Sequence, residues 1–132
     1  MPSQYSVIRY MPNFLNGEGV NIGVMAMDEQ NAKCKFLTDW TRAENFVGVT
    51  QEKMQSFIDE LERACSGKTT DGFKLNSLNF ADSYGRWQHS IQFSALRGTL
   101  RDYEELLEVT AELFLIDGEY KNRTVKSQKT GR

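Results

Sequence analysis

Polar and apolar residues alternate along three stretches in the first third of the chain. Residues 5–11 are rich in aromatic and β-branched side chains and end at a proline, while residues 20–28 and 32–37 alternate with one apolar face each. A period of two is typical of β-strands. The segments between them are short and contain glycine, asparagine and aspartate, which favour turns. We therefore predict an antiparallel meander of three strands.

Helical spacing appears in the middle of the chain and again near its end. In residues 51–65 apolar side chains recur every three or four positions, with Thr50 placed as the N-cap and Gly67 as the stop. Residues 41–48 predict a short helix with fewer apolar positions. A leucine-rich helix follows Thr99, which together with Asp102 resembles a capping box, and Gly118 is expected to end it.

Two further strands are predicted between the helices. Residues 73–80 give an irregular pattern, and residues 87–94 alternate with their aromatic and aliphatic side chains on one face. The order βββ(α)αββα predicts an α+β fold, with an antiparallel sheet of about five strands and two main helices packed on one face. We assign residues 1–118 to this single domain and residues 119–132 to a flexible basic tail.

Composition and charge indicate a globular protein with an acidic body and a basic tail. Hydrophobic residues make up 39% and charged residues 26% of the chain, as in globular proteins. The apolar runs are short, no secretory signal is visible and only two cysteines occur, so we expect a cytoplasmic protein. Residues 1–118 carry 11 basic against 17 acidic side chains, whereas the tail is basic. The basic residues of the tail are Lys121, Arg123, Lys126, Lys129 and Arg132.

Arg9, Glu18 and Asn21 form the most suggestive polar set. If the first two strands pair, Arg9 lies near the residues of the connecting loop, and Glu18 is placed to accept its guanidinium. Such a cluster binds a carboxylate, a phosphate or a partner's backbone, or else it ties the hairpin together with the Asn21 amide closing loop carbonyls. The sequence leaves both roles open.

Other reactive residues do not form a recognisable catalytic or metal motif. His89 falls on the apolar side of its predicted strand, which favours a packed histidine. Cys34 and Cys65 lie far apart in the sequence, one on a strand and one at a helix end. The glycines between residues 17 and 23 lead into a strand, whereas phosphate-binding loops open a helix. We therefore expect no catalytic residues, no cofactor and no metal.

Acidic side chains recur along the last predicted helix. They are Glu104, Glu105, Glu108 and Glu112. This stripe is either a solvated helix face or a surface that binds basic groups, from the protein's own tail or from a partner. The basic tail also suggests contact with nucleic acid, but the body is acidic and no aromatic platform lies among the cations, so nucleic acid is an unlikely partner.

The first strands carry a pattern of aromatic, glycine and polar residues. The positions are Tyr5, Arg9, Tyr10, Pro12, Gly17, Glu18, Asn21, Gly23 and Val24. In this pattern the chain resembles an uncharacterised bacterial family catalogued as domain of unknown function 3037, over roughly residues 4–117. Genes of that family are often described beside HipA-type kinases, so the resemblance implies an accessory or regulatory partner of such a kinase.

Three hypotheses on function follow. The leading one is a non-catalytic regulatory or adaptor protein that acts through protein–protein contacts. The competing one is a small-ligand-binding protein or enzyme with a pocket around Arg9, Glu18 and Asn21. Self-association is the third, because an uncovered sheet edge can pair across a homo-oligomer.

Overall fold

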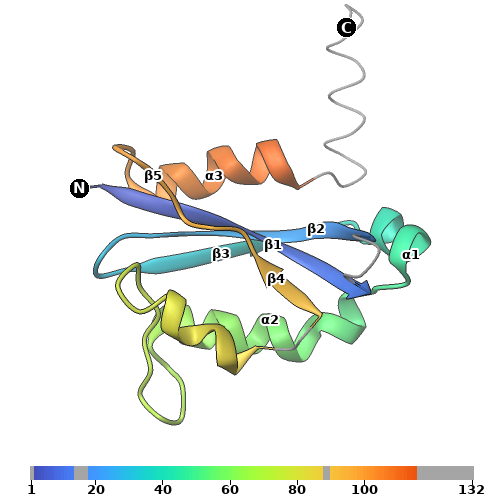
Figure 1. Cartoon of the computed structure of the whole chain (residues 1–132), viewed down its shortest axis with the longest axis horizontal. Coiled ribbons are helices and arrows are strands. Elements are labelled where there is room, and N and C mark those ends of the chain that lie inside the picture. The colour runs from blue at the N-terminus through green and yellow to red at the C-terminus, as the bar shows by residue number, and fades with distance from the viewer. Residues whose placement is uncertain (1, 14–17, 88–89, 116–132) are drawn as a thin grey trace, which may run out of the picture.

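A three-stranded antiparallel meander forms the centre of the molecule (Figure 1). The computed structural model describes residues 2–13, 18–87 and 90–115. The meander consists of β1 (Ser3–Asn13), β2 (Glu18–Met27) and β3 (Ala32–Phe36). The prediction from the alternating pattern is confirmed.

Two short strands complete the sheet on the other side of β1. They are β4 (Ile91–Phe93) and β5 (Arg97–Thr99), and both pair antiparallel with β1. The strand order is β3-β2-β1-β4, with β5 also on β1. The predicted α+β class and the antiparallel sheet of five strands are therefore confirmed, although the fifth strand is β5 and not the predicted strand at residues 73–80.

Three α-helices and one 3-10 helix lie around the sheet in the part of the chain that the structure describes. They are α1 (Thr41–Val47), α2 (Gln51–Ser66), α3 (Tyr103–Phe114) and η1 (Ala81–Arg86). Each helix in the described part of the chain is too short or too polar to cross a membrane.

The predicted caps of α2 are confirmed, but that of α3 is wrong. Thr50 Oγ1 accepts a hydrogen bond from Lys53 N at 3.1 Å, and Gly67 ends α2 with a φ of 75°. At α3, the carboxylate of Asp102 accepts the hydrogen bond from Glu104 N, and Thr99 is instead the last residue of β5. The predicted stop at Gly118 lies outside the described residues.

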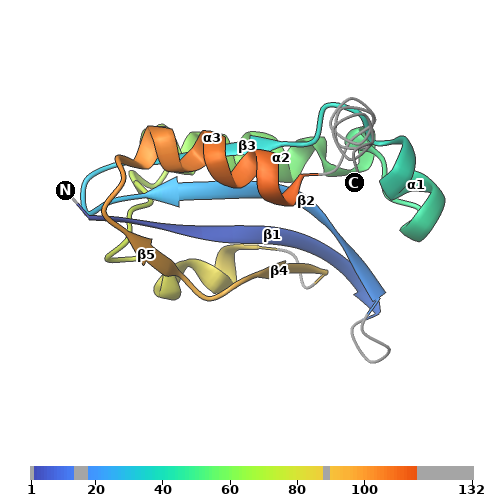
Figure 2. The ribbon, with the colours of Figure 1, turned by 90° about the horizontal axis from the view of Figure 1, so that it is seen from above.

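The main helices cover opposite faces of the sheet, so their predicted placement on one face is wrong. On one face, Tyr5 of β1 stacks on Phe114 of α3 at 5.9 Å between ring centroids. On the other, Phe36 of β3 meets Phe57 of α2 edge to face at 6.0 Å. Figure 1 shows α3 above and α2 below the strands, and in Figure 2 α3 passes in front of β3 and α2.

This three-layer arrangement buries β2 on both faces. Its apolar side chains are at most 6% exposed, on both the even and the odd positions. They are Val20, Ile22, Val24, Met25, Ala26 and Met27. A strand that is apolar on both faces needs a layer on each side of the sheet. The prediction treated only the even positions of β2 as the core face, which led to the wrong helix placement.

The predicted strand at residues 73–80 is wrong. The Asn76 carboxamide oxygen accepts hydrogen bonds from Leu78 N at 2.9 Å and from Asn79 N at 3.0 Å, and the Asn79 amide donates to Lys74 O at 2.8 Å. These side chains hold the backbone in turns instead of a sheet ladder. The buried Leu75 and Phe80 pack into the core from this loop.

The predicted strand at residues 87–94 is shorter than expected. Only Ile91–Phe93 is a strand, and Trp87 follows η1. The Trp87 ring contacts Phe57 at 5.8 Å and Phe93 at 6.2 Å between centroids, on the α2 face. His89 lies outside the described residues, so its packed role stays a prediction.

A close approach between β2 and β3 predicts the effect of adding a single methyl group. A Cβ at Gly23 of β2 would lie 2.7 Å from a ring carbon of Phe36 and 3.0 Å from the carbonyl oxygen of Lys35. We expect Gly23→Ala to lower the free energy of unfolding by about 1–3 kcal/mol, because a partly buried ring and an adjacent strand must shift. Urea unfolding measures it.

Gly85→Ala is the matched control, because a Cβ at Gly85 meets nothing within 4 Å. Equal stability of the two variants would show that Gly23 is not required for strand packing.

Candidate functional site

Arg9 and Asn21 are direct neighbours across the β1–β2 hairpin. The register pairs Arg9 with Asn21 just after a bulge, at which the pairing skips Ile22. The bulge turns Asn21 toward the α3 face of the sheet, where it reaches that helix. The structure therefore brings together two of the three residues of the predicted polar cluster.

Arg9 ties the two strands together near their connection. Its Nη2 donates a hydrogen bond to Gly19 O at 3.1 Å, while its Nε is buried and has no hydrogen-bond partner among the described residues. Glu18 pairs with Asn13 through the backbone, but its side chain lies outside the described residues. The ion pair between Arg9 and Glu18 therefore stays a prediction.

Asn21 joins the hairpin to the end of α3. Its Nδ2 donates to the backbone oxygen of Phe114, the last residue of α3, at 3.1 Å. Carbonyl groups in the last turn of a helix lack partners within the helix, so an external donor stabilises that end. We expected Asn21 to serve loop carbonyls, whereas the carbonyl that it serves belongs to a helix far along the chain.

Much of the acidic stripe on α3 binds basic groups of the same domain. Lys33 of β3 forms a salt bridge with Glu104, Lys35 of β3 pairs with Glu108 at 2.8 Å, and Arg101 pairs with Glu105 at 2.7 Å. The carboxylate of Glu104 raises the pKa of Lys33. Glu112 forms no salt bridge within the described part of the chain.

The outer edge of β3 is open. Leu37 N donates to Ile22 O, and Asp28 N donates to Asn31 O, which places the odd positions of β3 in hydrogen-bonded pairs with β2. The backbone N–H and C=O groups at positions 32, 34 and 36 therefore point away from β2. These groups have no backbone partner in residues 2–13, 18–87 and 90–115.

A depression of about 340 Å³ lies beside this edge, between β3, the last turn of α2 and the first residue of α3. Cys34 and Cys65 both line it, with Cys34 half-buried and Cys65 buried. The pKa of the Cys34 thiol is raised, first by a hydrogen bond with the Cys65 thiol and then by burial. Two cysteines distant in sequence are thus neighbours in space.

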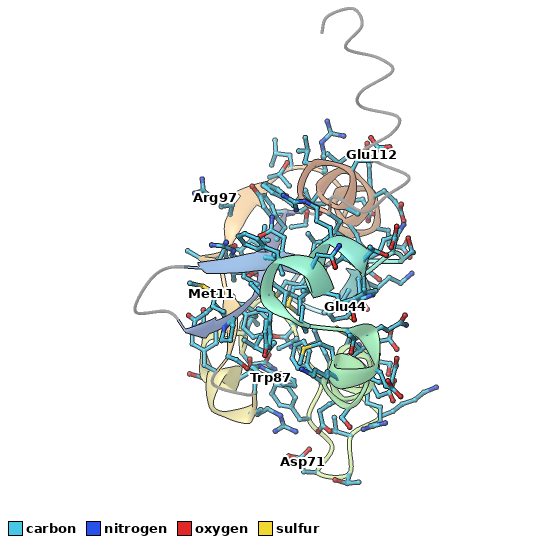
Figure 3. The ribbon with its side chains drawn as sticks, turned by 90° about the vertical axis from the view of Figure 1, so that its right-hand side faces the viewer. Met11, Glu44, Asp71, Trp87, Arg97 and Glu112 are labelled. Atoms are coloured by element: carbon cyan, nitrogen blue, oxygen red, sulfur yellow. The ribbon has the colours of Figure 1, made fainter. Side chains whose placement is uncertain are left out.

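A second depression, of about 560 Å³, lies between α1 and the start of α2. Three carboxylates line it, from Asp39, Glu44 and Glu52, and no basic residue does. Figure 3 faces this end of the molecule, with Glu44 on α1 and Glu112 on α3 both in view. We call Asp39, Glu44, Glu52 and Glu112 the acidic end.

We expected an uncovered sheet edge but did not place it on β3, and we did not predict the cysteine pair or the acidic end. The first depends on strand order, and the others on contacts between segments distant in sequence. The predicted basic tail, with Lys121, Arg123, Lys126, Lys129 and Arg132, lies outside the described residues. Within those residues, His, Cys, Asp and Glu side chains form no group of three or more that is arranged to hold a metal ion.

The family model described as "Protein of unknown function (DUF3037)" matches residues 5–114, so the chain belongs to this family. The match includes Arg9, Asn21 and all the strands and helices from β2 to α3. Comparison with curated proteins and with solved structures found no match.

The Asn21 hydrogen bond predicts a specific loss of stability. We expect Asn21→Asp to lower the free energy of unfolding by about 2 kcal/mol, because a carboxylate would replace the amide donor opposite the Phe114 carbonyl. Thermal and urea unfolding at neutral pH measure the change.

The control is Asn45→Asp on the exposed side of α1, which introduces the same charge. Equal stability of the two variants would contradict a stabilising role for the Asn21 amide.

Proposed function

We propose that this member of the DUF3037 family is a non-catalytic adaptor or regulatory protein of the cytoplasm. In this proposal it binds a partner protein through the open edge of β3 and the adjoining acidic end. One observation carries the proposal. The unpaired edge of β3 lies next to the depression between α1 and α2, and the charged residues that line this depression are all carboxylates.

The open edge supports a partner that adds a strand. The outward N–H and C=O groups at positions 32, 34 and 36 are a template for a further strand. A second copy of this chain is less favoured, because antiparallel pairing centred on Cys34 would place Lys33 opposite Lys35 of the other copy.

The acidic end supports a basic partner. Glu44 and Glu52 are exposed and form no salt bridge within the described residues, so a partner's lysine or arginine residues meet carboxylates that are not already neutralised. Complementary charge increases the rate of association and excludes acidic partners. A HipA-type kinase is the partner that we propose first, on the gene neighbourhood implied by the family resemblance.

Charge reversal at the acidic end tests this proposal. We expect Glu44→Lys combined with Glu52→Lys to weaken partner binding on the order of tenfold, because attraction becomes repulsion. The measurement is recovery of the partner with the full chain from its native host at low salt, identified by mass spectrometry, followed by titration of that purified partner.

The matched control combines Glu29→Lys with Asp82→Lys. Both residues are exposed, lie away from the acidic end and form no salt bridge in the described part of the chain. Equal weakening by both double variants, or no partner at any salt concentration, would count against the proposal.

A small anionic ligand is the second candidate, and the buried Nε of Arg9 is the observation that favours it. A carboxylate or phosphate would supply the missing acceptor. In that case acetate, succinate or phosphate raises the melting temperature of the wild type, and Arg9→Lys removes the rise because lysine lacks the fork of N–H donors.

Arg97→Lys on β5 is the control for this ligand test, since Arg97 is exposed. An identical response of all three proteins to the anions, or no response at all, would exclude the ligand site at Arg9.

A further inference from the structure

The two cysteines beside the open edge are close to each other and lie at one surface depression. Cys34 lies at the centre of β3 on the face toward α2, and Cys65 lies in the last turn of α2. The Cys65 thiol is near enough to raise the pKa of the Cys34 thiol. Both also line the same surface depression of about 340 Å³.

We propose that Cys34 and Cys65 are a modification site at which hydrogen peroxide forms a reversible intramolecular disulfide. The depression lets a molecule as small as hydrogen peroxide reach the sulfur atoms. The second thiol is close enough to react with the sulfenic acid that forms on the first. This proposal does not depend on the proposed function, because it requires no partner.

The reaction proceeds in two steps, formation of a sulfenic acid and then of the disulfide. The thiolate of one cysteine attacks a peroxide oxygen and forms an S–O bond, the O–O bond breaks, and hydroxide leaves and takes up a proton as water. The thiol of the other cysteine then attacks the sulfenic sulfur, forms the S–S bond and releases a second water. The two thiols lose two electrons and two protons, and one hydrogen peroxide becomes two waters. A dithiol reductant reverses the bond by thiol–disulfide exchange.

The surroundings of the thiols govern the rate. Charged and titratable groups line the depression from every element around it: Glu62 from α2, Lys33 from β3, Lys74 from the loop after α2 and Tyr103 from α3. The hydrogen bond to Cys65, burial and the carboxylate of Glu62 all raise the pKa of the Cys34 thiol. The attacking thiolate is therefore scarce at neutral pH, and oxidation accelerates as the pH rises.

The disulfide would fasten the edge strand to α2. It closes a loop that contains α1 and nearly all of α2, so it restricts the unfolded chain more than the folded one. The oxidised protein is therefore expected to melt at a higher temperature than the reduced protein.

The test uses the purified full chain, reduced and then treated with hydrogen peroxide. We expect both thiols to become resistant to alkylation, the intact monomer to lose the mass of two hydrogen atoms, and a digest to contain one peptide pair joined through Cys34 and Cys65. Dithiothreitol should restore both thiols, and the reaction should be faster at pH 9 than at pH 7. Peptide mapping separates this product from oxygen added at methionine.

Single variants test whether the product requires both cysteines. Cys34→Ser and Cys65→Ser each leave one thiol, and neither should form the linked peptide or gain melting temperature on treatment. The wild-type experiment decides the question even if a variant fails to fold. Unchanged thiols, sulfinic or sulfonic acid at either cysteine as the main product, or disulfides between chains would each overturn the proposal.

Discussion

The burial of β2 on both faces is the constraint on which the rest of the structure depends. Its side chains on even and odd positions are both excluded from water, so helices must cover the sheet from two sides. This requirement brings α3 to one face and α2, with η1, to the other. Asn21 and Gly23 interrupt the apolar sequence between Val20 and Met27, and each has a specific role. Asn21 donates a hydrogen bond to the end of α3, and Gly23 leaves room for the Phe36 ring.

Local sequence patterns were sufficient to predict the strands and helices whose conformation depends mainly on residues nearby in the sequence. Alternation located the first three strands, and helical spacing with Thr50 and Gly67 located α2 and its ends. Residues 73–80 were misassigned because hydrogen bonds from Asn76 and Asn79 override an apolar pattern that resembles a strand. β5 has three residues, too few for a recognisable period.

The candidate site was predictable only where its members are close in sequence. Arg9 and Asn21 were placed together correctly because a hairpin joins their strands. Lysines at positions 33 and 35 were assigned to a solvent-facing side of the sheet, because sequence spacing does not reveal that α3 covers this side. The same limitation concealed the contact between Cys34 and Cys65, since it depends on how α2 packs on β3.

Under the proposed function, the charges around β3 determine which class of protein the open strand edge accepts. Lysines on an edge strand oppose pairing between identical copies. Here Lys33 and Lys35 form salt bridges with Glu104 and Glu108 at the exposed surface, where such pairs contribute little to stability. These weak pairs leave the backbone edge accessible. In the same proposal, the unneutralised carboxylates of Glu44 and Glu52 favour a basic partner over a second acidic copy of this chain.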